Sequence, residues 1–205
     1  MSFYAFAKGL TYVVFRLIFK MEYDGLENIP DDRGYILASN HRSYLDPLFL
    51  AHKVNKSRLR FMAKEELFTK PLLGGIVRAL GAFPVSRGRN DMSAMQKARE
   101  VVREGGVLAI FPEGTRSEDG VPLRGKPGVA MIAGVVGCDV LPVGISFKDR
   151  LRFRRRVMVR YGKLITAGEL AIDPKTTSTI RGATVQIMDA VLSVIDRDCH
   201  GGFVG

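Results

Sequence analysis

The fold is organised around residues 35–47, YILASNHRSYLDP. The apolar run Tyr35–Ser39 predicts a short buried strand. Asp46 and Pro47 predict a helix start, because aspartate accepts hydrogen bonds from free backbone N–H groups and proline suits the first helical turn. His41 therefore lies on a loop between a strand end and a helix N-terminus, where α/β folds place their chemistry.

The spacing of His41 and Asp46 decides whether they can meet. On a continuous helix their side chains would point about 140° apart, so a turn between them is required. Each residue also has an ordinary interpretation: Asp46 as a helix cap and His41 as a solvated loop residue. His52, one or two helical turns further on, is expected at the surface. The case for a catalytic pair therefore rests on other segments of the chain.

Composition limits the classes of partner. The 205 residues suffice for one domain with a sizeable core. The net charge is +10, from 31 basic and 21 acidic residues, which suits nucleic acid, an anionic membrane or a phosphorylated substrate. Nucleic acid is disfavoured, because no RRM-like or zinc-finger signature is present. Cys138, Cys199 and three histidines form no metal-ligand pattern, so we expect no metal, and two thiols fit a reducing compartment.

Residues 3–21 are apolar and rich in aromatics but contain Lys8, Arg16 and Lys20. These charges argue against a spanning helix and against a signal peptide. At about 100° per residue they fall within roughly one third of a helix circumference. We expect residues 1–21 to form an amphipathic helix in the interface of an anionic membrane, and residues 22–205 to form the main domain. Such a chain would be peripheral, on the cytoplasmic face of the cell membrane. The alternative is a helix packed on the core.

The remainder alternates strand-like and helix-like segments. This pattern predicts a single α/β domain with a mostly parallel central sheet flanked by helices. The expected strands are Tyr35–Ser39, Leu59–Met62, Ala82–Val85, Val107–Phe111, Val140–Ile145 and Val157–Tyr161, and the expected helices are Pro47–Val54, Glu65–Phe68, Leu72–Leu80, Met92–Glu104, Val129–Val136 and Thr179–Arg197.

The segment FPEGTRS, residues 111–117, follows a predicted strand and should open at the same sheet edge as His41. Glu113, Thr115 and Arg116 surround Gly114. Thr115 offers a hydroxyl, Arg116 a fork of guanidinium donors, and Gly114 a backbone that a ligand can approach closely. Such a set suits a phosphate or a polyol. A charged surface turn is the alternative.

Two more segments stand out. Residues 81–89, GAFPVSRGR, end a predicted strand in two arginines, of which Arg87 could hold a phosphate bidentately. Residues 141–145, LPVGI, place proline and glycine inside a strand, which implies either an edge position or a close backbone approach.

In this order and spacing, the four segments resemble the four sequence blocks of the glycerolipid acyltransferases, most closely the 1-acylglycerol-3-phosphate acyltransferases. The resemblance covers roughly residues 20–165. The His41–Asp46 spacing alone is a weak signal, but together with FPEGTRS downstream it is strong. The second block departs from the commoner form at Ala82 and Pro84, which leaves the contacts at residues 83–86 open, although Arg87 is retained.

The resemblance implies transfer of a fatty acyl group from acyl-CoA or acyl-ACP to the sn-2 hydroxyl of 1-acyl-glycerol-3-phosphate (lysophosphatidic acid), giving phosphatidic acid with no further cofactor. The residues suit this chemistry. A neutral His41 could take the hydroxyl proton while Asp46 orients the imidazole. No Gly-x-Ser-x-Gly elbow is present, so we expect no acyl-enzyme.

By the same resemblance, Arg87, Glu113 and Arg116 hold the phosphate and glycerol of the acceptor. Gly114 allows close approach, and Thr115 assists. Glu113 would orient an arginine or a substrate hydroxyl, since like charges keep it from the phosphate. Lys64 is similar to a family lysine near the thioester oxyanion, and a solvated lysine is the alternative.

A basic cluster runs from Lys148 to Lys163, with eight basic residues and only Asp149 as an acid. Strand alternation would place Arg152, Arg154 and Arg156 on one face. Three roles compete: docking to anionic lipid, docking of the donor's carrier or coenzyme A phosphates, or a merely soluble surface.

For the protein as a whole, two other functions remain as alternatives: transfer to another lysolipid, or a non-catalytic peripheral membrane-binding protein.

Overall fold

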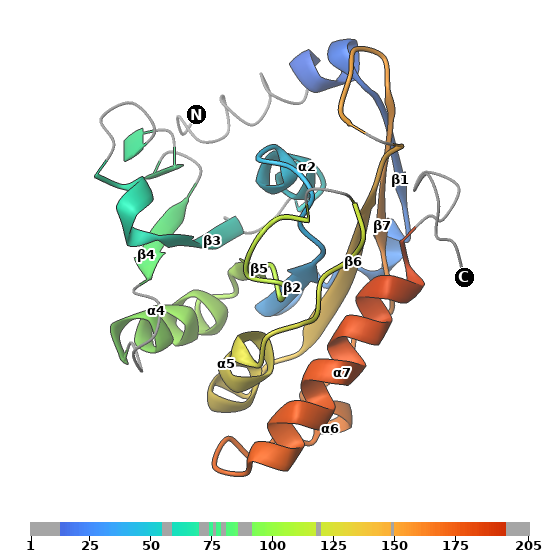
Figure 1. Ribbon diagram of the computed structural model, residues 1–205. Helices are drawn as coiled ribbons and strands as arrows, with labels where there is room; N and C mark the ends of the chain where they lie inside the picture. Colours follow the sequence, from blue (N-terminus) through green and yellow to red (C-terminus); the bar gives the residue numbers. More distant parts are fainter. Residues whose placement is uncertain are drawn as a thin grey trace.

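A twisted sheet forms the centre of the computed structural model, which describes residues 13–54, 59–69, 74–75, 77–78, 81–85, 92–117, 120–148 and 150–195 (Figure 1). These residues form seven strands in the order β1-β7-β6-β2-β5-β3-β4. The strands are β1 (Lys20–Asp24), β2 (Tyr35–Ser39), β3 (Leu59–Lys64), β4 (Ala82–Val85), β5 (Val107–Ile110), β6 (Val140–Ser146) and β7 (Arg156–Tyr161). The helices are η1 (Leu26–Asn28), α2 (Asp46–Ala51), η2 (Glu65–Leu67), α4 (Met92–Arg103), α5 (Gly128–Val136), α6 (Ala167–Leu170) and α7 (Thr177–Ser193).

Five neighbouring strands, from β6 across β2, β5 and β3 to β4, are parallel. β7 runs antiparallel to β6, and β1 runs parallel to β7. The prediction of a mostly parallel sheet is therefore confirmed. In the β2–β5 register Ala38 lies beside Ile110, so the loops that begin at residues 40 and 111 leave the same edge of the sheet.

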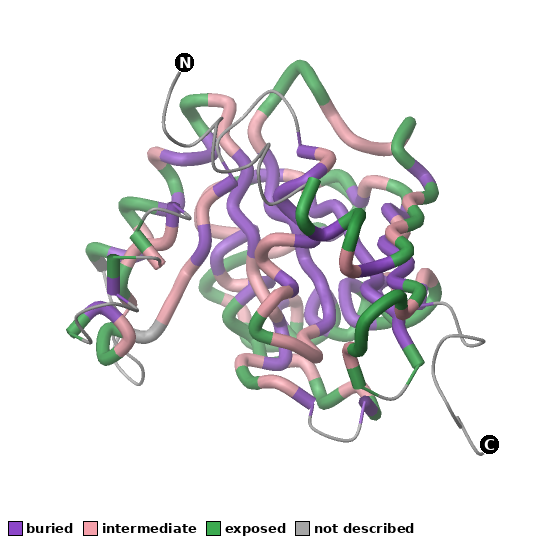
Figure 2. Tube along the Cα trace, turned by 90° about the horizontal axis from the view of Figure 1, so that it is seen from above, coloured by how far each residue is buried: buried purple, intermediate pink, exposed green. Residues whose placement is uncertain are grey.

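Both faces of the central strands are buried (Figure 2). In β2, Leu37 packs with α2 and the helical residues 13–18 on one face. Ile36 and Ala38 pack with α4, α5 and α7 on the other. Burial on both sides explains why the parallel strands are continuously apolar instead of alternating.

The N-terminal segment differs from the expectation at its end. Residues 13–18 are helical, but Lys20 and Met21 belong to β1, which the sequence did not predict. β1 pairs with β7 from Lys20–Arg156 to Asp24–Arg160. Ion pairs Glu22–Arg156 and Asp24–Arg160, each 2.8 Å long, cross this edge of the sheet.

One side of the helical residues 13–18 packs on the core. Phe15 and Phe19 are buried, and their rings lie edge-on to Phe49 of α2 with centroids 5.3 and 5.8 Å away. Val13 and Leu17 are exposed. For these residues the core-packed alternative holds in part, while residues 1–12 of the expected interfacial helix lie outside the described residues. Within the described ranges, no helix is long and apolar enough to cross a bilayer.

β6 shows how a strand accommodates proline and glycine. An edge position is wrong, because β6 lies between β7 and β2. Pro142 precedes the first β6–β7 pair, Val143–Tyr161. The close backbone approach is correct: a Cβ added to Gly144 would lie 2.6 Å from the carbonyl oxygen of Val194.

The basic cluster is not one strand face, which corrects the expected alternation. β7 begins only at Arg156, and Arg152 and Arg154 lie in the connection from β6. The expected helix at residues 72–80 lies largely outside the described residues.

Candidate active site

Asp46 holds the loop that carries His41. It is the first residue of α2, whose N-cap is Leu45, so Asp46 is not the cap that the sequence suggested. Its Oδ2 atom accepts from His41 Nδ1 at 2.8 Å and from the backbone N–H groups of Arg42 and Ser43 at 2.7 Å each. The carboxylate is fully buried, so the turn between the two residues wraps the loop around it.

The imidazole of His41 is fixed on a second side. It stacks on the ring of Phe111, with centroids 4.0 Å apart and an interplanar angle of 15°. Its side chain is 19% exposed. Because Nδ1 faces Asp46, Nε2 is the ring nitrogen that can act on a substrate. Phe111 begins the FPEGTRS segment, so the sequence pointed to the segment but not to this contact.

Asn40 anchors the start of the same loop. Its amide nitrogen donates to the carbonyl of Ile145 at 2.9 Å, and its oxygen accepts from the Ile145 N–H at 2.8 Å. This pair extends the β2–β6 ladder past its last backbone pair, Ser39–Val143. The sequence alone gave Asn40 no role. A buried amide that copies a peptide group is visible only once β6 is placed beside β2.

Glu113 lies beneath the site and not in it. It is 1% exposed, and its two oxygens accept from the backbone N–H groups of His41 at 2.8 Å and Leu123 at 2.9 Å. Burial raises the pKa of the Glu113 carboxyl, although these two hydrogen bonds oppose the effect. The expectation from the sequence was contact with an arginine or a substrate hydroxyl. In the structure both carboxylate oxygens bind main-chain donors, which connects two loops.

The third block, residues 111–117, contacts the first block, residues 40–46, at two further points. The Arg116 guanidinium lies 3.5 Å over the ring of Tyr44, which is exposed. The N–H of Ser117 donates to the carbonyl of His41 at 2.8 Å. Arg116 is therefore held above the loop by a cation–π contact.

The turn before Arg116 depends on glycine. Gly114 has φ 70°, in the left-handed region that other residues adopt only at a cost. Its N–H donates to the carbonyl of Phe111 at 2.9 Å, which closes the turn. Thr115 follows on the exposed side of it.

Arg42 connects the site to the end of β6. Its guanidinium donates to the carbonyl of Phe147 and lies 4.2 Å over the Phe147 ring. Gly120 packs against it so closely that an added Cβ would lie 2.3 Å from a guanidinium nitrogen. No local pattern in the sequence gave Arg42 a role, and its partners are visible only in the tertiary structure.

Two predicted site residues fall partly or wholly outside the described residues. Lys64 ends β3 and pairs along the backbone with Val85 of β4, but its side chain is not among them. Arg87 lies entirely outside them. Of the predicted residues, the structure thus brings together His41, Asp46, Glu113, Gly114, Thr115 and Arg116.

The expected surface position of His52 is wrong. The residue is 5% exposed, its Nδ1 lies 3.0 Å from the hydroxyl of Tyr23, and its ring meets Phe15 edge-on. Within the described residues, no group of three or more histidine, cysteine, aspartate or glutamate side chains is arranged to hold a metal.

A histidine that contacts a buried carboxylate at the carboxyl edge of a mostly parallel sheet defines the class as an α/β protein with a candidate site at that edge. The family model described as Acyltransferase matches residues 20–146, more than half of the sequence, so the chain belongs to this family.

Two bacterial relatives have the same name. The 1-acyl-sn-glycerol-3-phosphate acyltransferase of Streptococcus pneumoniae is 31% identical over 174 residues, which are 82% of this chain and 64% of that protein. The enzyme of the same name from Bacillus subtilis is 33% identical over 116 residues, 57% of each chain. The chain thus spans between 57% and 64% of the length of these two relatives.

A solved structure has the same fold. The crystal structure of the 1-acyl-sn-glycerophosphate acyltransferase of Thermotoga maritima matches with a TM-score of 0.64 at 29% identity. The match covers 86% of this chain and 71% of that one.

Proposed function

We propose that the protein transfers a fatty acyl group from a thioester to the sn-2 hydroxyl of 1-acyl-glycerol-3-phosphate, giving phosphatidic acid. The observation that carries this proposal is the 2.8 Å contact between His41 Nδ1 and Asp46 Oδ2 at the carboxyl edge of the sheet. Relatives named for this reaction and the matching solved structure support it.

In the proposed reaction, Nε2 of His41 accepts the proton of the acceptor hydroxyl as its oxygen bonds to the thioester carbonyl carbon. The carbon–sulfur bond then breaks, and the leaving thiolate receives that proton from the imidazolium. Asp46 fixes the tautomer with Nδ1–H and stabilises the imidazolium. General-base action accounts for about 10²–10⁴-fold of the rate, so positioning and oxyanion stabilisation supply the rest.

The acceptor would be held through its phosphate. Arg116 lies over Tyr44 on the rim of the site, where a guanidinium can bind phosphate bidentately. We assign Arg87 to the same phosphate, Gly114 and Thr115 to the glycerol, and Lys64 to the thioester oxyanion, from the sequence blocks they occupy. Glu113 takes a positioning role, because its carboxylate holds the His41 backbone.

The donor is acyl-CoA or acyl-ACP, and the protein acts as a peripheral protein on the cytoplasmic face of an anionic membrane. Two alternatives stay distinct from this: a different lysolipid acceptor within the same mechanism, and a membrane-binding protein without turnover. The buried carboxylate behind His41 favours an enzyme, since a docking protein has no need of it.

The test is an assay of the purified protein with both donors against a panel of lysolipids that differ in headgroup. We expect phosphatidic acid from lysophosphatidic acid, whose phosphate is a monoester. We expect at least about 10-fold lower kcat/KM with lysolipids in which a headgroup makes the phosphate a diester. Preference for a lysolipid with a headgroup would show that lysophosphatidic acid is not the acceptor. Absence of turnover with every pair would favour the non-catalytic alternative.

A further inference from the structure

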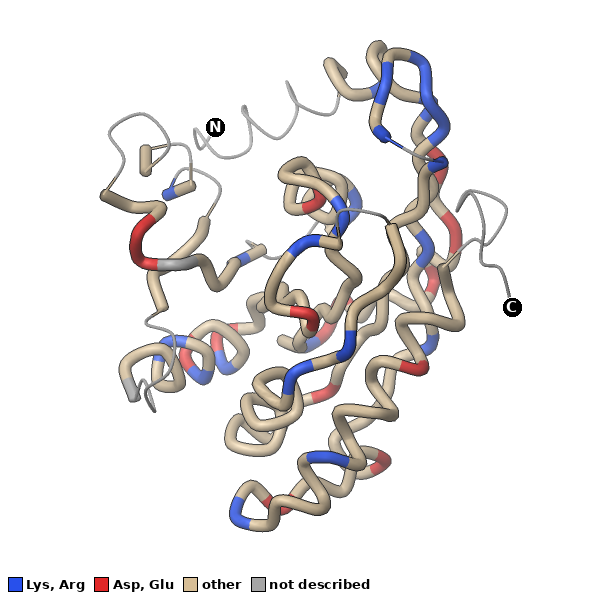
Figure 3. Tube along the Cα trace, in the orientation of Figure 1, with Lys and Arg blue, Asp and Glu red and all other residues tan. Residues whose placement is uncertain are grey.

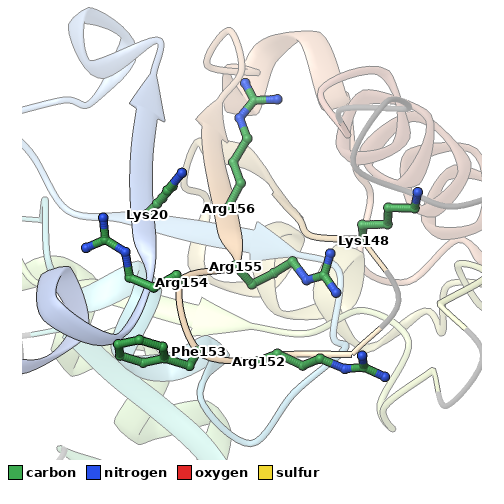
Figure 4. Close-up of a pocket in the computed structure, with 7 residues that line it drawn as sticks. All are labelled: Lys20, Lys148, Arg152, Phe153, Arg154, Arg155 and Arg156. Carbon is green, nitrogen blue, oxygen red and sulfur yellow. The ribbon is translucent and has the colours of Figure 1, made fainter.

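The connection between β6 and β7 carries a dense positive charge (Figure 3). We call Lys148 and residues 150–156 the arginine loop. A cavity of about 420 Å³ opens there (Figure 4). Its lining contains no acidic residue and consists of Lys20, Lys148, Arg152, Phe153, Arg154, Arg155 and Arg156. Arg156 pairs with Glu22 on the adjoining strand, at 2.8 Å. The cavity therefore concentrates cations that suit an anionic ligand.

The arginine loop is held in place by the backbone. The N–H of Arg154 donates to the carbonyl of Ile18, and the N–H of Lys20 donates to the carbonyl of Arg155 at 2.9 Å. Arg154 has φ 60°, a conformation that is costly for a residue other than glycine. The backbone at Arg154 is thus conformationally strained, and the side chains of Arg152 and Arg154 are exposed.

Apolar side chains project beside these charges. Phe153 is 76% exposed, and Leu17 and Val13 on the adjoining helical turn are 66% and 55% exposed. Single exposed apolar residues are ordinary, but Phe153 and Leu17 belong to two segments that meet, because the N–H of Arg154 donates to the carbonyl of Ile18. An exposed aromatic side chain with basic residues around it is typical of surfaces that lie in the interface of an anionic bilayer.

The arginine loop also lies close to the candidate active site. Phe147, which directly precedes Lys148, accepts a hydrogen bond from the guanidinium of Arg42 and packs beneath it. Arg42 follows His41 in the chain. The start of the arginine loop is thus joined through Phe147 and Arg42 to the segment that carries His41.

We propose that the arginine loop docks on the headgroups of anionic phospholipids, with Phe153 inserted below the level of the phosphates. This goes beyond the proposed acyl transfer, because it assigns a membrane contact to a loop outside the site. A soluble phosphorylated donor would match the charges of the cavity but would leave the exposed Phe153, Leu17 and Val13 without a partner. The bilayer matches both features.

A fluorescence experiment tests the insertion. The sequence contains no tryptophan, so Phe153→Trp in the full chain introduces a single reporter. Val185→Trp, at an exposed position of α7, is the matched control. With phosphatidylglycerol vesicles, we expect a blue-shifted emission and quenching by brominated acyl chains for Phe153→Trp alone. Vesicle binding without a shift, or no binding at all, would overturn the proposal.

A charge experiment tests the headgroup contact. The triple substitution Arg152→Gln, Arg154→Gln and Arg155→Gln should weaken binding to phosphatidylglycerol vesicles by about 100-fold at low salt. The control variant replaces three exposed residues by glutamine: Arg103 of α4, Lys175 before α7 and Arg181 of α7. It removes the same amount of positive charge and should change vesicle binding less than about threefold.

No acyl donor is present in these binding assays, so their outcome is independent of the proposed reaction. If the arginine-loop variant bound vesicles like the unaltered protein, the proposal would be wrong. If it instead raised the donor's KM in vesicle-free solution while vesicle binding was unaffected, the loop would belong to the donor's phosphates, and the docking proposal would again be overturned.

Discussion

The carboxylate of Glu113 accepts a hydrogen bond from the backbone N–H of His41 at 2.8 Å, across a separation of 72 residues. The third block thus fixes the backbone of the first, and Asp46 fixes its imidazole. A histidine that is held from both sides keeps its direction while a substrate binds, which is the pre-organisation that the proposed general-base role needs. The proposed base, its partner and its support can be tested separately.

Replacing His41 by alanine should lower the kcat/KM of acyl transfer by at least about 10³-fold, because the proposed base is lost. The fold should stay intact, because the ring is partly exposed and Asp46 keeps two backbone donors. The measurement is kcat/KM with circular dichroism of the same sample. Normal turnover by the variant would show that another group acts as the base.

Asp46→Asn keeps the shape of the side chain but removes its charge. Oδ2 accepts from the imidazole and from the N–H groups of Arg42 and Ser43. An amide oxygen in the same place could still accept these bonds, but it lacks the negative charge that stabilises the imidazolium. We expect kcat to fall by about 10²–10⁴-fold, with a much smaller loss of stability. A kcat within about tenfold of the unaltered protein would remove Asp46 from the mechanism.

Glu113→Gln tests the support. Glutamine offers one acceptor oxygen where the carboxylate uses two, so one backbone N–H, of His41 or Leu123, loses its partner. We expect the free energy of unfolding to fall by about 1–3 kcal/mol and kcat to fall with little change in KM. Rescue by Glu113→Asp is not expected, because the shorter chain does not span both donors.

The same variant has a pH dependence of known sign. Burial raises the pKa of Glu113 in the folded protein, so the native state binds more protons than the unfolded state as the pH rises from about 4. The unaltered protein therefore loses stability over this range relative to Glu113→Gln. Denaturant unfolding at several pH values should show the difference between the two shrinking as the pH increases, and a growing difference would contradict the raised pKa.

Arg116→Ala should raise the acceptor's KM by at least about tenfold and the donor's KM far less, since a guanidinium bound to phosphate contributes a charge-assisted hydrogen bond pair. Tyr44→Ala is the companion variant. It removes only the ring under Arg116 and should raise the same KM by about two- to fivefold. Equal effects of Arg116→Ala on both substrates would remove the phosphate assignment.

Phe15→Ala tests the N-terminal helical turn as part of the core. Its ring is buried against Phe19, Phe49 and His52, so we expect a loss of about 3–5 kcal/mol in the free energy of unfolding. Leu17→Ala, at an exposed position of the same turn, should stay within about 0.5 kcal/mol. Equal effects would mean that this turn is not docked in solution.

Local patterns were enough to predict the framework of the site. The strand at Tyr35–Ser39, the loop with His41 and the helix after it all follow from neighbouring residues, because apolar runs and turn residues act over short distances. The common sheet edge also followed, since parallel strands of one sheet have their carboxyl ends at the same edge. The strand β1 could not be predicted in this way. Three of its five residues are charged, and its partner β7 lies more than 130 residues away.

Neighbouring residues alone specify which side chains stand at the carboxyl ends of β2 and β5, because buried strands and their loops are encoded locally. The contacts of those side chains were settled by packing. Asp46 binds a loop instead of capping its helix, Glu113 binds the backbone of His41, and His52 is buried against Tyr23. A hydrogen bond depends on where distant segments are brought together in space, and no single stretch of the chain carries that information.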